Sequence, residues 1–283
     1  MIRVKEIMTK SVVTVNPSDD LYIAKEKMIR HNINRVVVIE NERIVGILTR
    51  KDIIRAASEL LHKEVDKILV FEAMTPNPIT VDPETPIPEV ARIMLERNIS
   101  SLIVTENDRL TGIVTKTDIC RFFAERCQGL FKVSDFMTRE VITTSQNSSI
   151  FRAIDLMREK NISRVIVTDD NRPVGIITVT DVSLISAIFN PQAIKERGEP
   201  LIVVMEKKGL VIPPSPMMIL SLTARDVMTS KLICVMADDD LSQAAKLMID
   251  NRISGLPVID ETGGLCGVIT KTDITRATAQ LKT

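Results

Sequence analysis

Residues 46–52, Gly-Ile-Leu-Thr-Arg-Lys-Asp, carry a pattern that the chain repeats three more times. The copies are Gly-Ile-Val-Thr-Lys-Thr-Asp at 112–118, Gly-Ile-Ile-Thr-Val-Thr-Asp at 175–181 and Gly-Val-Ile-Thr-Lys-Thr-Asp at 267–273. A Met-Thr pair precedes each copy, at a spacing that changes by one residue only in the last repeat. The four methionines are Met8, Met74, Met137 and Met228. The chain is therefore an array of four repeats, and one unit contains the information on fold and function.

Apolar residues recur at the same places in every copy and predict the secondary structure of the unit. In the second repeat, the apolar residues step at helical spacing and predict an amphipathic helix with one face to bury. These residues are Ile87, Val90, Ala91, Met94 and Leu95. Two β-prone runs joined by a short polar segment follow and predict a hairpin, which leads into Thr-x-x-Asp and a further apolar helix. Each unit is thus predicted to be β-α-β-β-α, a mixed α/β (α+β) fold.

The Met-Thr start, the Asn-Ile or Arg-Ile that closes the first helix and the terminal Gly-x-x-Thr-x-x-Asp resemble the marks of the CBS domain, the ligand-sensing module named after cystathionine β-synthase. The resemblance implies that copies associate in pairs with pseudo-twofold symmetry, as Bateman modules, and that two clefts form between the members of each pair. The first repeat would pair with the second and the third with the fourth. The layout of four units is similar to that of the regulatory γ subunit of AMP-activated protein kinase.

The repeats divide the chain into four expected CBS segments, at 1–60, 70–125, 133–188 and 223–283. A long connection at 189–222 separates the third repeat from the fourth. Its β-prone runs at 201–205 and 210–212 predict an extra hairpin, and Pro-Pro-Ser-Pro follows at 213–216. Two interpretations remain open: the connection folds over a module face or docks a partner, or it is a packed spacer.

Composition argues against some classes of partner. Lys plus Arg number 37, and Asp plus Glu also number 37. The chain therefore has no net charge that would attract nucleic acid or an anionic membrane. Neither a recognition-helix motif nor interleaved basic and aromatic residues are visible, so nucleic acid is not expected. The apolar runs are shorter than the roughly 18 residues of a membrane span, and the N-terminus lacks a signal-peptide pattern. We expect a cytoplasmic protein without a membrane span.

Metal and catalytic chemistry have few candidate residues. The cysteines Cys120, Cys127, Cys234 and Cys266 form no CxxC pair, so reduced and partly buried thiols are favoured over a metal site. The sequence shows no nucleophile beside a base and no phosphate-cradling glycine loop. We therefore expect a protein that is not an enzyme, with no catalytic residue and no catalytic cofactor.

The recurring Thr-x-x-Asp has two interpretations. It is close to a capping box, in which both side chains serve only the helix start. The resemblance implies instead that the Asp accepts hydrogen bonds from the ribose hydroxyls of an adenosine ligand while the Thr holds the sugar or a phosphate. The two roles are compatible, because a helix N-terminus also attracts phosphate. The candidate pairs are Thr49 with Asp52, Thr115 with Asp118, Thr178 with Asp181, and Thr270 with Asp273.

The second position after the helix-closing Ile differs between odd and even repeats: Arg35, Ser101, Arg164 and Gly255. The resemblance implies that a basic residue here reaches a phosphate, a role that suits the arginine fork. Each pair would then contribute one phosphate-binding arginine, Arg35 or Arg164. The alternative is a solvated arginine at a helix end, where a cation suits the dipole.

A second position, in the first strand, carries Thr14, Thr80 and Thr143 but Cys234 in the last repeat. The resemblance implies that the polar residue here meets the ligand base. Because cysteine is a poor hydrogen-bonding substitute, a site that depends on the first strand of the fourth repeat is the least expected.

These observations favour a regulatory protein that senses an adenine nucleotide, AMP, ADP or ATP, and acts through conformational change on a partner enzyme or transporter. One alternative is a sensor of S-adenosylmethionine or another adenosyl ligand, since a ribose-directed Asp would serve it equally. A second alternative is a ligand-free interaction scaffold whose Thr-x-x-Asp elements are only caps. The sequence leaves open whether the chain forms a homodimer.

Overall fold

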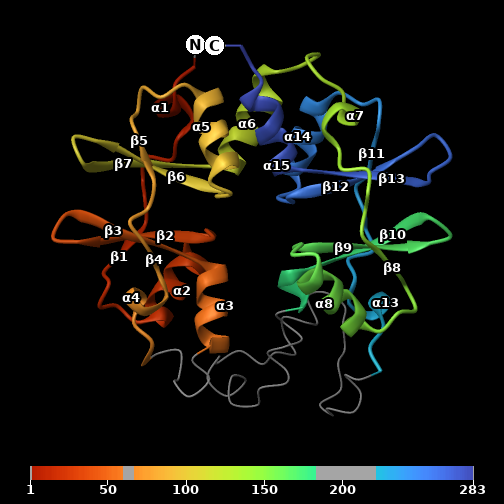
Figure 1. The fold of residues 1–283 in the computed structure, drawn as a ribbon, viewed down its shortest axis with the longest axis horizontal. Helices are drawn as coiled ribbons and strands as arrows, with labels where there is room; N and C mark the ends of the chain where they lie inside the picture. Colours follow the sequence, from red (N-terminus) through yellow and green to blue (C-terminus); the bar gives the residue numbers. More distant parts are fainter. Residues whose placement is uncertain (1, 60–66, 183–220, 283) are drawn as a thin grey trace. The chain divides into compact units, whose positions relative to one another are not determined.

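The computed structural model describes residues 2–59, 67–182 and 221–282. The chain folds into two compact units (Figure 1). Unit 1 contains Met1–Cys127 and Lys271–Thr283, and unit 2 contains Gln128–Thr270. The extra hairpin predicted at 201–212 lies outside the described residues and stays a prediction.

Unit 1 contains the first two repeats. The first has α1 (Val4–Ile7), β1 (Thr14–Val15), α2 (Leu21–Arg30), β2 (Arg35–Glu40), β3 (Arg43–Thr49) and α3 (Arg50–Glu59). The second has α4 (Val70–Ala73), β4 (Thr75–Pro76), β5 (Thr80–Val81), α5 (Ile87–Glu96), β6 (Ser101–Glu106), β7 (Arg109–Thr115) and α6 (Lys116–Arg126). The last helix of the chain, α15 (Lys271–Ala279), also belongs to this unit.

Unit 2 contains most of the other two repeats. The third has α7 (Val133–Phe136), β8 (Thr143–Ser145), α8 (Ile150–Glu159), β9 (Arg164–Asp169) and β10 (Arg172–Thr178). The fourth has α13 (Ala224–Val227), β11 (Val235–Met236), α14 (Leu241–Asp250), β12 (Gly255–Ile259) and β13 (Leu265–Thr270). The predicted mixed α/β fold is confirmed. A short helix before each Met-Thr pair, α1, α4, α7 or α13, was missing from the prediction because four residues are too few to show a helical period.

Each repeat forms a small sheet with one pattern of pairing. The first short strand lies parallel to the second strand, which pairs antiparallel with the third, as in β5-β6-β7 and β11-β12-β13. In the first three repeats the hairpin turns place two successive residues at positive φ, as at Asn107 (50°) and Asp108 (59°). This is the backbone conformation of a type I′ turn, which matches the twist of the flanking strands.

The Met and Gly of the repeated motif meet across each pair of repeats. A Cβ on Gly267 would lie 2.7 Å from Sδ of Met137, and one on Gly112 would lie 2.5 Å from Sδ of Met8. The reciprocal contacts bring Met74 to Gly46 and Met228 to Gly175. Only a residue without a side chain leaves room for the methionine. The repeats are therefore arranged as the expected couples, the first with the second and the third with the fourth.

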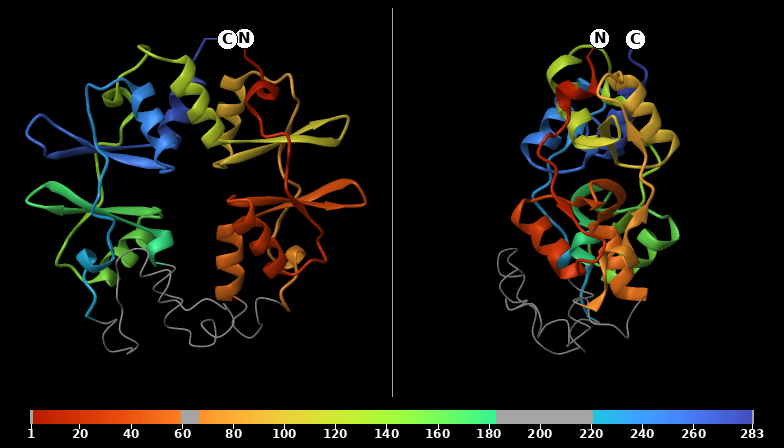
Figure 2. Two further views of the ribbon diagram at one scale, coloured as in Figure 1. Left: turned by 180° about the vertical axis from the view of Figure 1, so that it is seen from behind. Right: turned by 90° about the vertical axis from the view of Figure 1, so that its left-hand side faces the viewer.

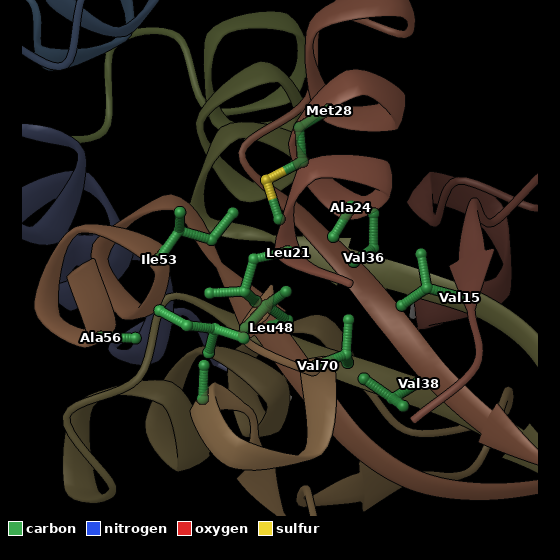
Figure 3. Packing of buried hydrophobic residues seen from close by; sticks show 12 residues of the cluster. Val15, Leu21, Ala24, Met28, Val36, Val38, Leu48, Ile53, Ala56 and Val70 are labelled. Carbon is green, nitrogen blue, oxygen red and sulfur yellow. The ribbon is translucent and has the colours of Figure 1, made fainter. Parts of the chain in front are cut away.

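The hydrophobic cores show the same exchange. Val70 and Ala73 of the second repeat are buried in the cluster of the first repeat, together with Leu21 and Leu48 (Figure 3). In return, Val4 joins the cluster of the second repeat. Ala224 and Val227 of the fourth repeat likewise join the cluster of the third. The first three repeats thus complete their cores with a segment of their partner.

Within unit 1 the two sheets stack on each other, with α2 and α3 beyond one sheet and α5 and α6 beyond the other (Figures 1 and 2). Val37 of β2 and Ile103 and Ile113 of the other sheet form a buried cluster. Helix α15 packs against α5 and α6. Among the described residues, no helix combines the length and the apolar character that a membrane crossing requires.

Candidate functional site

Unit 2 contains a cavity of about 340 Å³ between its two repeats. The third repeat contributes the end of β10 and the start of the following helix, and the fourth contributes the segments before β11 and around the start of β12. The lining residues are Arg164, Ile176, Thr178, Thr180, Asp181, Thr229, Lys231, Leu232, Ile233, Arg252, Ile253, Ser254, Gly255 and Pro257. The volume lies in the range of about 300–1,000 Å³ that is usual for small-molecule sites.

Asp181 is buried at the first turn of the helix that follows β10. Its Oδ2 accepts hydrogen bonds from the backbone N–H of Thr178 (2.8 Å) and from its Oγ1 (2.7 Å). The side chain is only 5% exposed, although the residue lines the cavity. The strand end and the helix start thus fix one carboxylate oxygen, as a capping box requires.

The same capping geometry occurs at two other copies of the motif. Asp52 accepts from N–H and Oγ1 of Thr49 at 2.9 and 2.6 Å, and Asp118 accepts from those of Thr115 at 2.9 and 2.7 Å. Their second oxygens accept from arginines one turn along the helix, Arg55 at 3.0 Å and Arg121 at 3.2 Å. In the fourth repeat, Thr270 ends β13, and buried Asp273 in α15 pairs with Arg276 at 3.1 Å. The cap and a ligand contact remain compatible roles for each carboxylate.

The arginines of the odd repeats reach across to the even repeats. Nη2 of Arg164 donates to Oγ of Ser254 at 3.0 Å, and a Cβ on Gly255 would clash with Nη1 of the same guanidinium. In unit 1, Nη1 of Arg35 donates to the carbonyl of Ser100 at 2.8 Å. In unit 2 the small residue therefore has a steric reason, because Gly255 makes room for the arginine of its partner repeat.

The environment of Arg35 is partly buried and contains a carboxylate. Burial lowers the pKa of Arg35, and the charge of Asp118 opposes this shift. Because arginine keeps its proton under all ordinary conditions, this residue is a permanent cation near the carboxylate of the second repeat. Arg35 and Asp118 are thus brought together in unit 1, as Arg164 and Asp181 are in the cavity of unit 2.

The helix starts of α6 and α15 meet in unit 1 through two reciprocal contacts. Nζ of Lys116 donates to Oγ1 of Thr272 at 3.2 Å, and Nζ of Lys271 donates to Oγ1 of Thr117 at 3.1 Å. Burial is the main cause that lowers the pKa of Lys116, against the opposing charge of Asp273. These contacts place both lysines beside the first turns that carry Asp118 and Asp273.

The threonines of the first strands occupy different places from the cavity residues. Thr14 is half-buried in β1, whereas Thr80 in β5 and Thr143 in β8 are exposed. Thr143 belongs to unit 2 but does not line its cavity. In the fourth repeat, the segment of Lys231, Leu232 and Ile233 lines the cavity, and Cys234 after it does not. In unit 2 the structure thus brings Arg164, Thr178 and Asp181 together, whereas Thr143 lies outside their cavity.

Five polar residues of the cavity were not among the candidate site residues: Thr180, Thr229, Lys231, Arg252 and Ser254. A signal for Arg252 was present, because the other repeats carry Asn32, Asn98 and Asn161 at the same place. Lys231 stands at a position whose occupants differ in size and charge between repeats, so the pattern gave no signal for it. A signal for Ser254 was present, because two other repeats also carry serine there, Ser100 and Ser163. Among the described residues, no group of three His, Cys, Asp or Glu side chains is arranged to hold a metal ion.

Comparison with known proteins places these features in a family. The model of the CBS domain matches residues 4–59, 69–125, 133–186 and 224–280. Protein MJ1404 of Methanocaldococcus jannaschii is 31% identical over 285 residues, which cover 99% of this chain and 62% of that protein. The chain thus spans less than two thirds of this relative.

Two solved structures share the fold over nearly the whole chain. Protein MJ1225 of M. jannaschii, described as a candidate archaeal homologue of g-AMPK, has a TM-score of 0.73 at 25% identity, with 98% of this chain and 99% of that chain covered. A conserved protein of Pyrococcus horikoshii has a TM-score of 0.68 at 19% identity, with 98% and 100% covered. The chain therefore belongs to the CBS domain family, with four CBS domains arranged in two pairs in the layout of Bateman modules.

Proposed function

We propose that the protein is a regulatory sensor of an adenine nucleotide and that the cavity of unit 2 is a binding site for AMP, ADP or ATP. CBS-domain proteins generally act as regulatory ligand sensors. One observation carries the choice of ligand: the same cavity contains a buried carboxylate, Asp181, and an arginine that reaches in from β9, Arg164. A carboxylate suits a pair of sugar hydroxyls, and a guanidinium suits a phosphate.

The ribose would bind at Asp181. A carboxylate offers about four lone-pair sites, and the cap uses two of them on Oδ2. The hydroxyl of Thr178 donates to Asp181, so its oxygen can accept from a sugar hydroxyl. The start of the helix adds a positive dipole end close to the first phosphate.

The adenine would bind between aliphatic walls. Ile176, Leu232 and Ile233 line the cavity, and the protein has no tryptophan and one tyrosine, so stacking on an aromatic ring is not the expected mode. Apolar walls with a few convergent polar groups are typical of small-molecule sites. The first phosphate would then meet Arg164, whose orientation is set by its hydrogen bond to Ser254.

Occupancy would be signalled through the contact between paired repeats. A nucleotide in the cavity would touch β10 of the third repeat and the start of β12 of the fourth. Its affinity would therefore differ between two arrangements of the paired repeats, and binding would favour one of them. A partner enzyme or transporter that binds one arrangement would respond to the nucleotide. We expect the ligand to be recovered unchanged, since the proposed role is binding without turnover.

The test is thermal unfolding of ligand-free protein with adenosine, AMP, ADP, ATP, S-adenosylmethionine, NAD or buffer. A ligand at 100 times its Kd adds about 2.7 kcal/mol of stability to the native state. For a protein of this size that corresponds to a shift of several degrees in Tm. We expect shifts with adenine mononucleotides. A shift only with S-adenosylmethionine or NAD would favour a different adenosyl ligand, and no shift with any ligand would favour a scaffold.

Asp181→Ala supplies the site-specific arm of this test, and Asp226→Ala is its matched control. Asp226 makes the same cap with Thr223, at 2.8 and 2.7 Å, but lies outside the cavity. Both variants should lose about 1 kcal/mol of stability, the usual cost of a lost cap. Only Asp181→Ala should lose the nucleotide-induced shift in Tm that is due to unit 2. An equal shift in both variants would contradict the proposed site.

A further inference from the structure

The backbone at Arg252 has a conformation that arginine seldom adopts. Its φ is 54°, in the left-handed region, as are those of Asn32 (51°), Asn98 (49°) and Asn161 (50°) at the same place in the other repeats. Asparagine is several-fold enriched in this region, because its short polar side chain can bond locally, whereas arginine has no such compensation. The fourth repeat therefore carries a strained cation where the other repeats carry a residue that suits the backbone.

The strained arginine lines the cavity of unit 2, together with a second cation that is specific to the fourth repeat. Lys231 stands where the other repeats have Ser11, Asn77 and Glu140. Both side chains are exposed and border the cavity, and no ion pair joins either of them to another residue within the described part of the chain. Strained backbone conformations cluster at ligand sites, where the strain is part of how a side chain is presented to the ligand.

Within the described part of the chain, the charged residues that line the cavity are Arg164, Lys231 and Arg252 against the single carboxylate of Asp181. A nucleoside would meet an excess of positive charge there, and one phosphate on Arg164 would leave the two exposed cations without an anionic partner. Each additional phosphate brings further negative charge and acceptor oxygens, which form strong charge-assisted hydrogen bonds with such cations.

We infer that Arg252 and Lys231 bind the terminal phosphates of the ligand and make the cavity of unit 2 selective for a nucleoside di- or triphosphate over the monophosphate. This inference rests on the proposed function and specifies its ligand. Arg252 is then a specificity-determining residue. Its contact with the phosphates explains why the fourth repeat has an arginine in the strained left-handed conformation.

The experiment is calorimetric titration of the full chain with adenosine, AMP, ADP and ATP. Arg252→Asn installs the residue of the other three repeats, and Lys231→Asn installs that of the second. We expect the parent to bind ATP at least about tenfold more tightly than AMP, a difference of about 1.4 kcal/mol. Arg252→Asn should remove about tenfold of the ATP affinity and change the AMP affinity by less than about twofold, because a lost charge-assisted bond affects only the ligand that makes it.

Two controls separate this inference from general effects. Arg172→Asn removes one positive charge from an exposed site of unit 2 outside the cavity, and it should leave the ratio of ATP to AMP affinity unchanged. Asn161→Arg creates the same strained arginine in the third repeat, also outside the cavity, and should lower stability without changing the ratio. A parent that binds AMP as tightly as ATP, or an unchanged ratio in Arg252→Asn, would overturn the inference and leave the proposed function standing. Binding of none of the four ligands to the parent would overturn both.

Discussion

Units 1 and 2 share a pairing mechanism but differ in the charges around it. In each unit an arginine from the odd repeat, Arg35 or Arg164, reaches a serine of the even repeat. Unit 2 adds Lys231 and Arg252, where unit 1 has Asn77 and Asn98. The comparison shows that the residues that hold a pair together are common to both units, whereas the residues around them can give each unit a ligand preference of its own.

The largest loss of stability is expected from a substitution in the contact between paired repeats. Gly112→Val should lower the free energy of unfolding by about 1–3 kcal/mol, because the added side chain overlaps Met8 of the first repeat. Met8→Ala combined with Gly112→Val should recover part of this loss in urea denaturation. Met137→Ala, which opens the equivalent space in unit 2, should not. Equal recovery by both second substitutions would contradict the specific Met–Gly contact.

The next effect concerns the arginine of unit 2. Gly255→Ala should displace Arg164, since a Cβ there would clash with its guanidinium and lie 3.0 Å from the carbonyl of Ile269. We expect about a tenfold loss of nucleotide affinity, the usual worth of one charge-assisted bond. Ser101→Ala, the corresponding change in unit 1, should leave affinity and stability within about 0.5 kcal/mol of the parent. Calorimetric titration measures the affinity, and urea denaturation measures the stability. An unchanged affinity in Gly255→Ala would mean that Arg164 does not contact the ligand.

A smaller effect should distinguish the two units in stability alone. Arg252→Asn should raise the free energy of unfolding by about 0.5–1 kcal/mol, because asparagine tolerates the left-handed backbone better than arginine does. Asn98→Arg in unit 1 should lower it by a similar amount. Urea denaturation of the ligand-free variants measures the change. A loss of stability in Arg252→Asn would mean that Arg252 has a structural role.

The cysteines give the mildest contrast between the units. In unit 1, burial raises the pKa of Cys120 to about 12 and that of Cys127 to about 11. In unit 2, burial also raises the pKa of Cys234 and Cys266, but both side chains are partly exposed. Because the thiolate is the reactive form, iodoacetamide at pH 8 should modify Cys234 and Cys266 before Cys120 and Cys127. Peptide mass spectrometry measures the order, and early modification of Cys120 would contradict its burial.

The same shifts set a dependence of stability on pH. A thiol whose pKa is higher in the folded state keeps its proton there, while the unfolded chain loses its proton above about pH 9. The unfolded state then binds fewer protons, so stability contributed by Cys120 is complete below about pH 8 and decreases as the pH rises from about 9 toward 12. Cys120→Ala should show a weaker decrease over this range in urea denaturation.

The fold was largely predictable from the sequence, because each position of the repeat can be compared in four copies. The Met-to-Gly register, the helix of apolar residues and the hairpin recur without gaps through three repeats. The short helices such as α1 were not predictable, since a single turn has no periodicity. The exchange of Met8 and Met74 between partners was not predicted, because sequence spacing cannot tell a contact within a repeat from one between repeats.

The candidate site was predictable in its recurring part and not in its variable part. Asp181 lies at a position that recurs in all four repeats and Arg164 at one that alternates between odd and even repeats, and the structure brings them into one cavity. Lys231 and Arg252 come from loops of the other repeat, and only the pairing places them opposite Asp181. The steric role of Gly255 was likewise invisible, because a missing side chain has no meaning until the arginine that needs its space is known.

The most direct test of the central claim is a crystal structure of the protein grown with ATP. We predict electron density for the nucleotide in the cavity of unit 2, with the ribose hydroxyls at Asp181, the first phosphate at Arg164 and the outer phosphates toward Lys231 and Arg252. An empty cavity at a saturating ATP concentration, or a nucleotide bound there with its phosphates turned away from Arg164, would contradict the account.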